Sequence, residues 1–158
     1  MKLTEIVVNE AIIPELGSTD RDGVLTELVE AKLEAGAADP AHGQDLIAKL
    51  LERERKGSTG FGRGVAVPHV KHPSVKKMAA AVGLSAGGLD FDALDKQPVY
   101  SVFLLISPDD RPEEHLQAME AIFANLSKES FRRLLRQATT RERVIELLEE
   151  ADSQHLAG

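Results

Sequence analysis

Residues 99–106 read Val-Tyr-Ser-Val-Phe-Leu-Leu-Ile, an almost unbroken run of apolar and β-branched residues. A run of this length and composition predicts a strand, and the lack of polar alternation predicts that both its faces are covered. Shorter runs of the same character at residues 64–67 and 78–84 predict further strands. A central strand of this kind requires a sheet that is packed between two layers.

Helical patterns occur on both sides of these strands in the sequence. Apolar residues recur at spacings of three and four, and proline, threonine or aspartate precedes several of the patterns. The patterns cover residues 20–35, 39–56, 112–126, 130–137 and 140–150. We therefore expect an α/β three-layer sandwich, in which a small mixed β-sheet is covered by helices on both faces. Residues 1–158 are expected to form one domain, with a polar, frayed tail at 151–158.

Composition excludes several classes of function. The net charge is -7, and the basic residues are scattered with no basic stripe between aromatics, which argues against a nucleic-acid partner. There is no cysteine, so disulfides and thiolate chemistry are excluded. No run approaches 18 apolar residues, and the first residues lack the apolar segment of a signal peptide. These features predict a cytoplasmic protein without direct membrane insertion.

The most informative motif is residues 53–69, which read Arg-Glu-Arg-Lys-Gly-Ser-Thr-Gly-Phe-Gly-Arg-Gly-Val-Ala-Val-Pro-His. A glycine-rich loop leaves a helix and enters a short β-branched segment. The backbone amides of this loop, with the hydroxyls of Ser58 and Thr59, could surround one phosphoryl group. A dinucleotide fingerprint would need the opposite order of strand and helix, and a P-loop would need a lysine that is missing here. A mobile surface turn is the alternative interpretation of the glycines.

His69 ends this motif, at the end of the predicted strand. The fixed backbone of Pro68 restrains its approach. An imidazole with the ordinary pKa of about 6.5 is mostly neutral at pH 7, so a ring nitrogen can act as a nucleophile. His115 lies in the first turn of a predicted helix, beyond the carboxyl end of strand 99–106, where α/β sheets tend to place their sites. The two histidines are candidates for phosphoryl transfer, and a polar surface role or a half-buried structural role is the alternative.

Other features have simpler interpretations beside the functional one. Arg53 can bind a phosphoryl oxygen, or it can form ion pairs on the end of its own helix. His69 and His72 resemble a metal-binding pair, but no third ligand is evident, so neither a metal nor a cofactor is expected. His42 and His155 are predicted at the surface. A small-molecule hydrolase is disfavoured, because no set of nucleophile, base and orienting residue is recognisable.

The segments Arg53-Glu54, Gly57-Ser58-Thr59-Gly60, Gly64-Val65-Ala66-Val67-Pro68-His69 and Glu114-His115-Leu116 resemble the enzyme IIA domain of the fructose/mannitol type, from the bacterial phosphoenolpyruvate-dependent sugar phosphotransferase system. The single-domain nitrogen-regulatory form is the most similar in layout. The resemblance spans nearly the whole chain.

This resemblance implies that His69 takes a phosphoryl group from the phosphohistidine of HPr or a paralogue. It also implies that His115 orients the group, that Arg53 and Thr59 steady its oxygens, and that an enzyme IIB or a regulated protein is the acceptor. One departure is Val70, where members commonly have glycine, so the loop after His69 is expected to run differently. The leading hypothesis is a phosphocarrier. The alternative is a regulatory binding module that uses phosphorylation only as a switch, or not at all. The sequence does not indicate a particular sugar.

Overall fold

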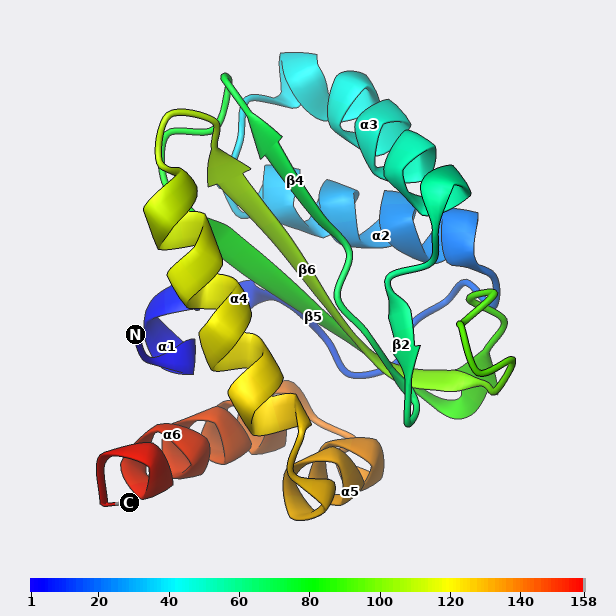
Figure 1. Ribbon diagram of the computed structural model, residues 1–158, viewed down its shortest axis with the longest axis vertical. Coiled ribbons are helices and arrows are strands. Elements are labelled where there is room, and N and C mark those ends of the chain that lie inside the picture. Colours follow the sequence, from blue (N-terminus) through cyan, green and yellow to red (C-terminus); the bar gives the residue numbers. More distant parts are fainter. Residues whose placement is uncertain (158) are drawn as a thin grey trace.

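The computed structural model describes residues 1–157, with side chains described through Gln154. One sheet lies between two groups of helices (Figure 1). The elements in chain order are α1 (Leu3–Ile6), β1 (Val7–Ile13), α2 (Arg21–Glu34), the 3-10 turn η1 (Pro40–His42), α3 (Gly43–Lys56), β2 (Gly60–Gly62), β3 (Val65–Ala66), β4 (His69–His72), β5 (Ala79–Leu89), β6 (Val99–Pro108), α4 (Pro112–Leu126), α5 (Glu129–Gln137) and α6 (Arg141–Ala157).

The sheet has six strands and mixed direction. Its order is β1-β5-β6-β3-β2, and β4 also pairs with β6, beyond β3 along the same edge. β6 runs parallel to β3 and β4 but antiparallel to β5, while β1 runs parallel to β5. The expected α/β sandwich with a small mixed sheet is confirmed.

Strand β6 occupies the centre of this sheet, as its apolarity predicts. Nine of its ten residues are buried, and Tyr100 alone in the strand is half-buried. Leu104 and Leu105, which are adjacent in the strand, belong to different cores because successive side chains point to opposite faces. Helices α2 and α3 cover one face, and α1, α4, α5 and α6 cover the other (Figure 1). The two layers of helices hold the sheet rigidly between them.

Three strands lie where the sequence predicts none. β1 is interrupted by the exposed pair Asn9 and Glu10, and its pairing with β5 shifts register between Val7 and Ile12, which hides the apolar pattern. β2 is only three residues long. β4 begins immediately after Pro68 and contains two histidines and a lysine, so its composition does not indicate a strand. In each case the pairing comes from neighbouring strands and not from local propensity.

The end of the chain differs from the expectation of a frayed tail. Helix α6 continues through Ala157, and Ala151 and Asp152 are buried. The carboxylate of Asp152 accepts hydrogen bonds from the backbone amides of Leu3 and Thr4, at 2.7 and 3.1 Å, and from the Thr4 hydroxyl. The segment from residue 151 is therefore fixed at its start by contacts with α1. His155 lies outside the described side chains.

Helix α2 buries one lysine, Lys32, in the interior of the protein. Its side chain is fully buried, and its Nζ donates a hydrogen bond to the carbonyl oxygen of Ala79, at 2.6 Å. Burial lowers the pKa of Lys32 well below its ordinary value. The contact ties α2 to the start of β5. Among the described helices, none has the length and apolarity needed to cross a membrane.

Candidate functional site

Two short strands and the proline between them fix the position of His69. β3 pairs with β6 through Val65 and Ala66, and pairing resumes in β4, where His69 lies opposite Leu105. Pro68 has no amide hydrogen, but its carbonyl oxygen accepts from the amide of Leu105, at 2.9 Å. His69 therefore begins a strand, and does not follow the end of one as the sequence predicts. Its backbone is held by the central strand.

The ring of His69 is oriented by its own backbone. Its Nδ1 lies 2.9 Å from the carbonyl oxygen of Val67. Because a carbonyl only accepts, Nδ1 must carry the proton in this contact. In the neutral ring the lone pair is then on Nε2, for which no hydrogen bond is found among the described residues. The partly exposed ring thus presents a nucleophilic nitrogen away from the contact that fixes it.

His115 lies against His69 from the other side of the site. The ring centroids are 5.6 Å apart and the ring planes are inclined by 54°. His115 is buried, and its Nδ1 lies 2.7 Å from the Oγ of Ser107, near the end of β6. Burial first, and then the positive charges of His69 and Lys71, lower the pKa of His115 to about 4. His115 is therefore neutral at pH 7.

A buried chain of hydrogen bonds leads from helix α3 to His69. The Glu54 carboxylate, which is 3% exposed, accepts from the backbone amide of Thr59, at 3.1 Å, and from the Thr59 hydroxyl. The carbonyl of Thr59 accepts from the amide of Val67, at 3.1 Å. The carbonyl of Val67 then accepts from His69, as described above. The chain fixes the loop against the strand that carries the histidine.

The three residues expected to bind a phosphoryl group are close to this chain, but their side chains bond within the protein. Arg53 donates from Nη1 to the carbonyl of Gly57, at 2.6 Å, which closes the end of α3. The Ser58 hydroxyl accepts from the amide of Gly60, at 3.0 Å, and lies 3.5 Å from the carbonyl of Phe91. Thr59 is fully buried and bonds to Glu54. Their contact with a phosphoryl group stays a prediction.

The glycine-rich loop is more ordered than the sequence suggests. Residues 60–62 form β2 and pair with β3, and the amides of Thr59 and Gly60 donate to side chains of the protein. These two amides are therefore not directed at a ligand, unlike those of an open anion-binding loop. Val70 has a similarly simple explanation. It lies in β4 opposite Ile106 and packs against the α2 and α3 side, so a β-branched residue suits its position.

A second pair of histidines lies at the other end of β4. His72 is buried, and its Nε2 lies 2.5 Å from the Oδ2 of Asp45. Its Nδ1 accepts from the amide of Ser74, at 3.0 Å, and lies 2.6 Å from the Ser74 hydroxyl. His42 is the exposed neighbour, with its ring centroid 5.6 Å away. His69 and His72 therefore bond to different partners, and no metal-binding group of three residues is found in the described part of the chain.

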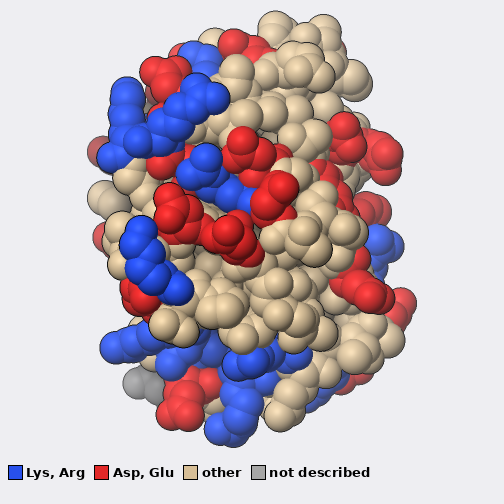
Figure 2. Space-filling view, turned by 90° about the vertical axis from the view of Figure 1, so that its right-hand side faces the viewer, with Lys and Arg blue, Asp and Glu red and all other residues tan. Residues whose placement is uncertain are grey.

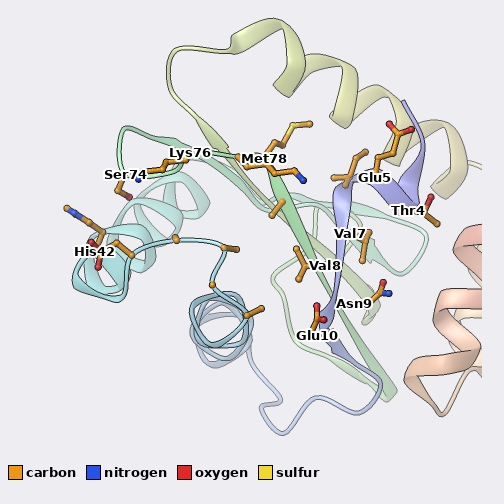
Figure 3. A pocket seen from close by; sticks show the side chains of 18 of the residues that line it. Thr4, Glu5, Val7, Val8, Asn9, Glu10, His42, Ser74, Lys76 and Met78 are labelled. Carbon is orange, nitrogen blue, oxygen red and sulfur yellow. The ribbon is translucent and has the colours of Figure 1, made fainter.

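The cavities found in the described part of the chain include two large ones. The larger, of about 860 Å³, lies between β1 and the connection from α2 to η1. Val8 and Asn9 line one side of it and His42 and Ser74 the other (Figure 3). The second, of about 460 Å³, is lined by α5 and the start of β6. Neither His69 nor His115 lines either of these two cavities.

The fold is an α/β sandwich in which two histidines, on β4 and α4, lie against each other beside the central strand β6. These features define the class of proteins with which the chain is compared. The family model described as "Phosphoenolpyruvate-dependent sugar phosphotransferase system, EIIA 2" matches residues 5–151. This chain therefore belongs to the EIIA 2 family of that system.

Two curated relatives are 32% identical to the chain. One is a fructose-specific EIIA component of the phosphotransferase system from Haloferax volcanii, where the alignment covers 94% of this chain and 95% of the relative. The other is a fructose-specific EIIABC component from Bacillus subtilis, where it covers 96% of this chain but only 24% of the relative. The chain thus spans about a quarter of that relative.

Two solved structures share the fold. The nitrogen regulatory protein IIA-Ntr from Neisseria meningitidis has a TM-score of 0.82 and 30% identity, with 91% of this chain and 97% of that chain covered. A complex of enzyme IIAMTL and phosphorylated enzyme IIBMTL from Escherichia coli has a TM-score of 0.76, with 91% and 97% covered. At 21% identity, this second likeness shows the fold alone.

Proposed function

We propose that residues 1–158 act as one enzyme IIA domain in which His69 accepts a phosphoryl group on Nε2. The observation that carries this proposal is the contact of Nδ1 with the Val67 carbonyl, which leaves the lone pair on Nε2. In the step, Nε2 forms a bond to phosphorus while the bond from phosphorus to a donor imidazole breaks. The donor nitrogen keeps the electron pair, so no further reactant is needed. Positioning is then the main requirement, as in other phosphoryl transfers.

We assign the orienting role to His115. The ring is neutral at pH 7 because its pKa is about 4. If the Ser107 hydroxyl donates to Nδ1, the proton of His115 is on Nε2 and can be donated to a phosphoryl oxygen. A neutral donor binds the transferring group without holding it as tightly as a cation would. Arg53, on the last turn of α3, supplies the positive charge predicted to steady the phosphoryl oxygens.

The partners we propose are phosphohistidine carriers of the HPr type as donors, and an enzyme IIB or a regulated protein as acceptor. Phe61 and Leu116 support docking of a protein, because both are exposed apolar side chains near the two histidines in the sequence. Phe61 is held against Phe123 of α4 with its ring edge toward the other ring, centroids 5.0 Å apart. The similar proteins include both a sugar-specific component and a nitrogen regulatory protein. We therefore propose both sugar transport and regulation as uses of the phosphoryl group. A cytoplasmic location stays a prediction.

Intact-protein mass spectrometry tests the proposal. The chain is incubated with phosphoenolpyruvate, enzyme I and HPr, and kept under alkaline conditions that preserve phosphohistidine. We expect one added phosphoryl group in the wild type and none in His69→Ala. His72→Gln is the matched control, because it removes the other strand histidine and should keep the label.

Two outcomes would contradict the assignment. A label that persists in His69→Ala would place the phosphoryl group elsewhere. No label with a cognate HPr-type donor would favour the alternative, a regulatory binding module that no longer uses phosphorylation. Capture of a kinase, a transporter or a transcription regulator, without any enzyme IIB, would support that alternative.

A further inference from the structure

The cavity of about 460 Å³ has an unusual lining for this acidic chain. Four of its lining residues are arginines, namely Arg63, Arg132, Arg133 and Arg136, and only two are acidic. The whole chain has a net charge of -7. In Figure 2, basic side chains gather at the lower end of the molecule, where α5 lies in Figure 1. The lining of this cavity is thus more basic than acidic, in contrast to the whole chain.

The arginines of this cavity have no acidic partners. Among the side chains that the structure describes, none of the four guanidinium groups lies within 4.0 Å of a carboxylate. Asp95, one of the two acidic residues of the lining, instead accepts from the backbone amides of Arg63 and Gln97, at 3.2 and 3.1 Å. With four arginines and two acidic residues, the lining keeps a formal excess of two positive charges.

Helix α5 presents its basic face to the cavity. Arg132 and Arg136 are four residues apart and Arg133 and Arg136 three apart, so they share one side of the helix, while Phe131 and Leu135 are buried on the other. Like charges at these spacings repel each other and destabilise a helix. An anion bound between the helix and the opposite wall would attract each of these arginines and offset their mutual repulsion.

Two of the arginines are held in place before any ligand binds. The guanidinium of Arg136 lies over the ring of Tyr100, with its central carbon 3.5 Å from the ring centroid. Stacking leaves the edge of the guanidinium plane free to donate hydrogen bonds. Arg132 donates from Nη1 to the carbonyl of Leu126, at 2.8 Å. Arg63 approaches from the opposite wall, on the turn between β2 and β3.

We propose that this cavity binds a small organic phosphate with at least two negative charges. Its volume lies within the range of small-molecule pockets, and converging guanidinium groups match the planar oxygen pairs of phosphates. Arginines from two walls fit a ligand with two phosphate groups, or a polyphosphate, better than a single inorganic ion. The site is separate from His69 and does not depend on the function proposed above.

Titration calorimetry at low salt tests this inference, with pyrophosphate and metal-free ATP as the probes. We expect a Kd below about 1 mM for both. Arg133→Gln and Arg63→Gly should each weaken binding about tenfold, the usual effect of losing one charge-assisted hydrogen bond. Glycine suits position 63, because the φ of Arg63 is +60°. Lys128→Gln is the matched control, since it removes one charge at the exposed start of α5 outside the cavity and should change the Kd less than about twofold.

Three results would overturn the proposal. The first is no heat of binding from either probe. The second is equal weakening by Lys128→Gln, which would show general attraction to a basic surface. The third is equally tight binding of citrate, which would assign the cavity to carboxylates. Phosphorylation of His69 is measured on the same variants. A loss of anion binding can then be told apart from a failure of the proposed phosphocarrier function.

Discussion

The two histidine pairs at the ends of β4 have nearly the same geometry and different surroundings. In both pairs the ring centroids are 5.6 Å apart, and the planes are inclined by 54° for His69 and His115 and by 55° for His42 and His72. His72 uses both ring nitrogens, one with Asp45 and one with Ser74. His69 uses only Nδ1. Proximity of two rings does not by itself define a reactive site.

The difference lies in what each environment does to a ring nitrogen. A carboxylate partner and a second hydrogen bond make His72 a structural link between β4 and α3. At the other end, backbone and hydroxyl groups fix the rings of His69 and His115, and no carboxylate hydrogen bond to either ring is found among the described residues. A histidine that must bind and release a phosphoryl group needs a fixed ring and one nitrogen without a partner.

The largest effect that separates the pairs is expected from His115→Ala. Acceptance by His69 should persist, but transfer onward should slow about a hundredfold, as for the loss of one donor to a developing charge. Single-turnover transfer from labelled protein to an acceptor measures the rate. His42→Ala is the control from the other pair and should leave it unchanged. Equal slowing in both variants would mean that His115 has no special role.

Glu54→Gln tests the hydrogen-bond chain behind His69. The carboxylate accepts from the Thr59 amide through one oxygen and from the Thr59 hydroxyl through the other. Glutamine replaces one of these oxygens with an NH2 group that only donates, so one buried donor loses its acceptor. We expect a loss of about 2 kcal/mol in the free energy of unfolding and about tenfold slower labelling of His69. Urea denaturation and labelling rates measure the two effects. The control is Glu52→Gln, at an exposed position on the same helix, which should change neither the free energy of unfolding nor the labelling rate. An unchanged labelling rate in Glu54→Gln would limit Glu54 to a role in folding.

A third comparison concerns the pH dependence of stability, whose effect is small near neutral pH and grows toward acid. The pKa of His115 falls from its ordinary 6.5 to about 4 in the folded state, so at acidic pH the unfolded chain binds a proton that the folded chain does not. The free energy of unfolding should therefore decrease as the pH falls from 6.5 toward 4, at up to about 1.4 kcal/mol per pH unit from this group. Denaturation curves of wild type and His115→Gln give the difference. Parallel pH curves for the two proteins would contradict the shift.

The smallest effect is expected from Asp45→Asn. The hydrogen bond from His72 is the main cause that lowers the pKa of the Asp45 carboxyl, but that carboxyl is exposed to solvent. We expect a small fall in Tm at pH 7 and unchanged labelling of His69. The contribution of Asp45 is present above the ordinary pKa of a carboxyl and is lost in acid. Slower labelling in this variant would show that the two ends of β4 are coupled.

The fold was more predictable than the detail of the sheet. The apolarity of residues 99–106 predicts the central strand. The helical patterns predict α2, α3, α4 and α5 close to their observed bounds, and they predict the start of α6 but not its end at Ala157. β4 was not predictable, because Pro68 interrupts the run and His69-Val70-Lys71-His72 has no strand signal. Its pairing depends on the parallel neighbour β6, which a local pattern does not contain.

The sequence makes His69 and His115 candidates that lie together, but it does not contain the bonds that orient their rings. Their meeting follows from the order of β6 and α4, since the helix begins four residues after the strand ends. The hydrogen bond between Ser107 and His115 had only a weak indication in the sequence. Ser107 is a polar residue at the end of an apolar strand, eight positions before His115. The pairing of Glu54 with Thr59 depends on how the chain leaves α3, and sequence composition does not determine that path.

The hydrogen bonds from Leu3 and Thr4 to Asp152 also constrain the order in which the molecule can be assembled. Helix α1 has only four residues and no side-chain cap of its own, so its first amides are satisfied by a residue 149 positions later. During synthesis, that partner is translated only after the whole sheet and the first 11 residues of α6. Helix α1 is therefore translated long before the residue that satisfies its first amides. Contacts of such long separation are slow to form, so we expect α1 to dock late in folding.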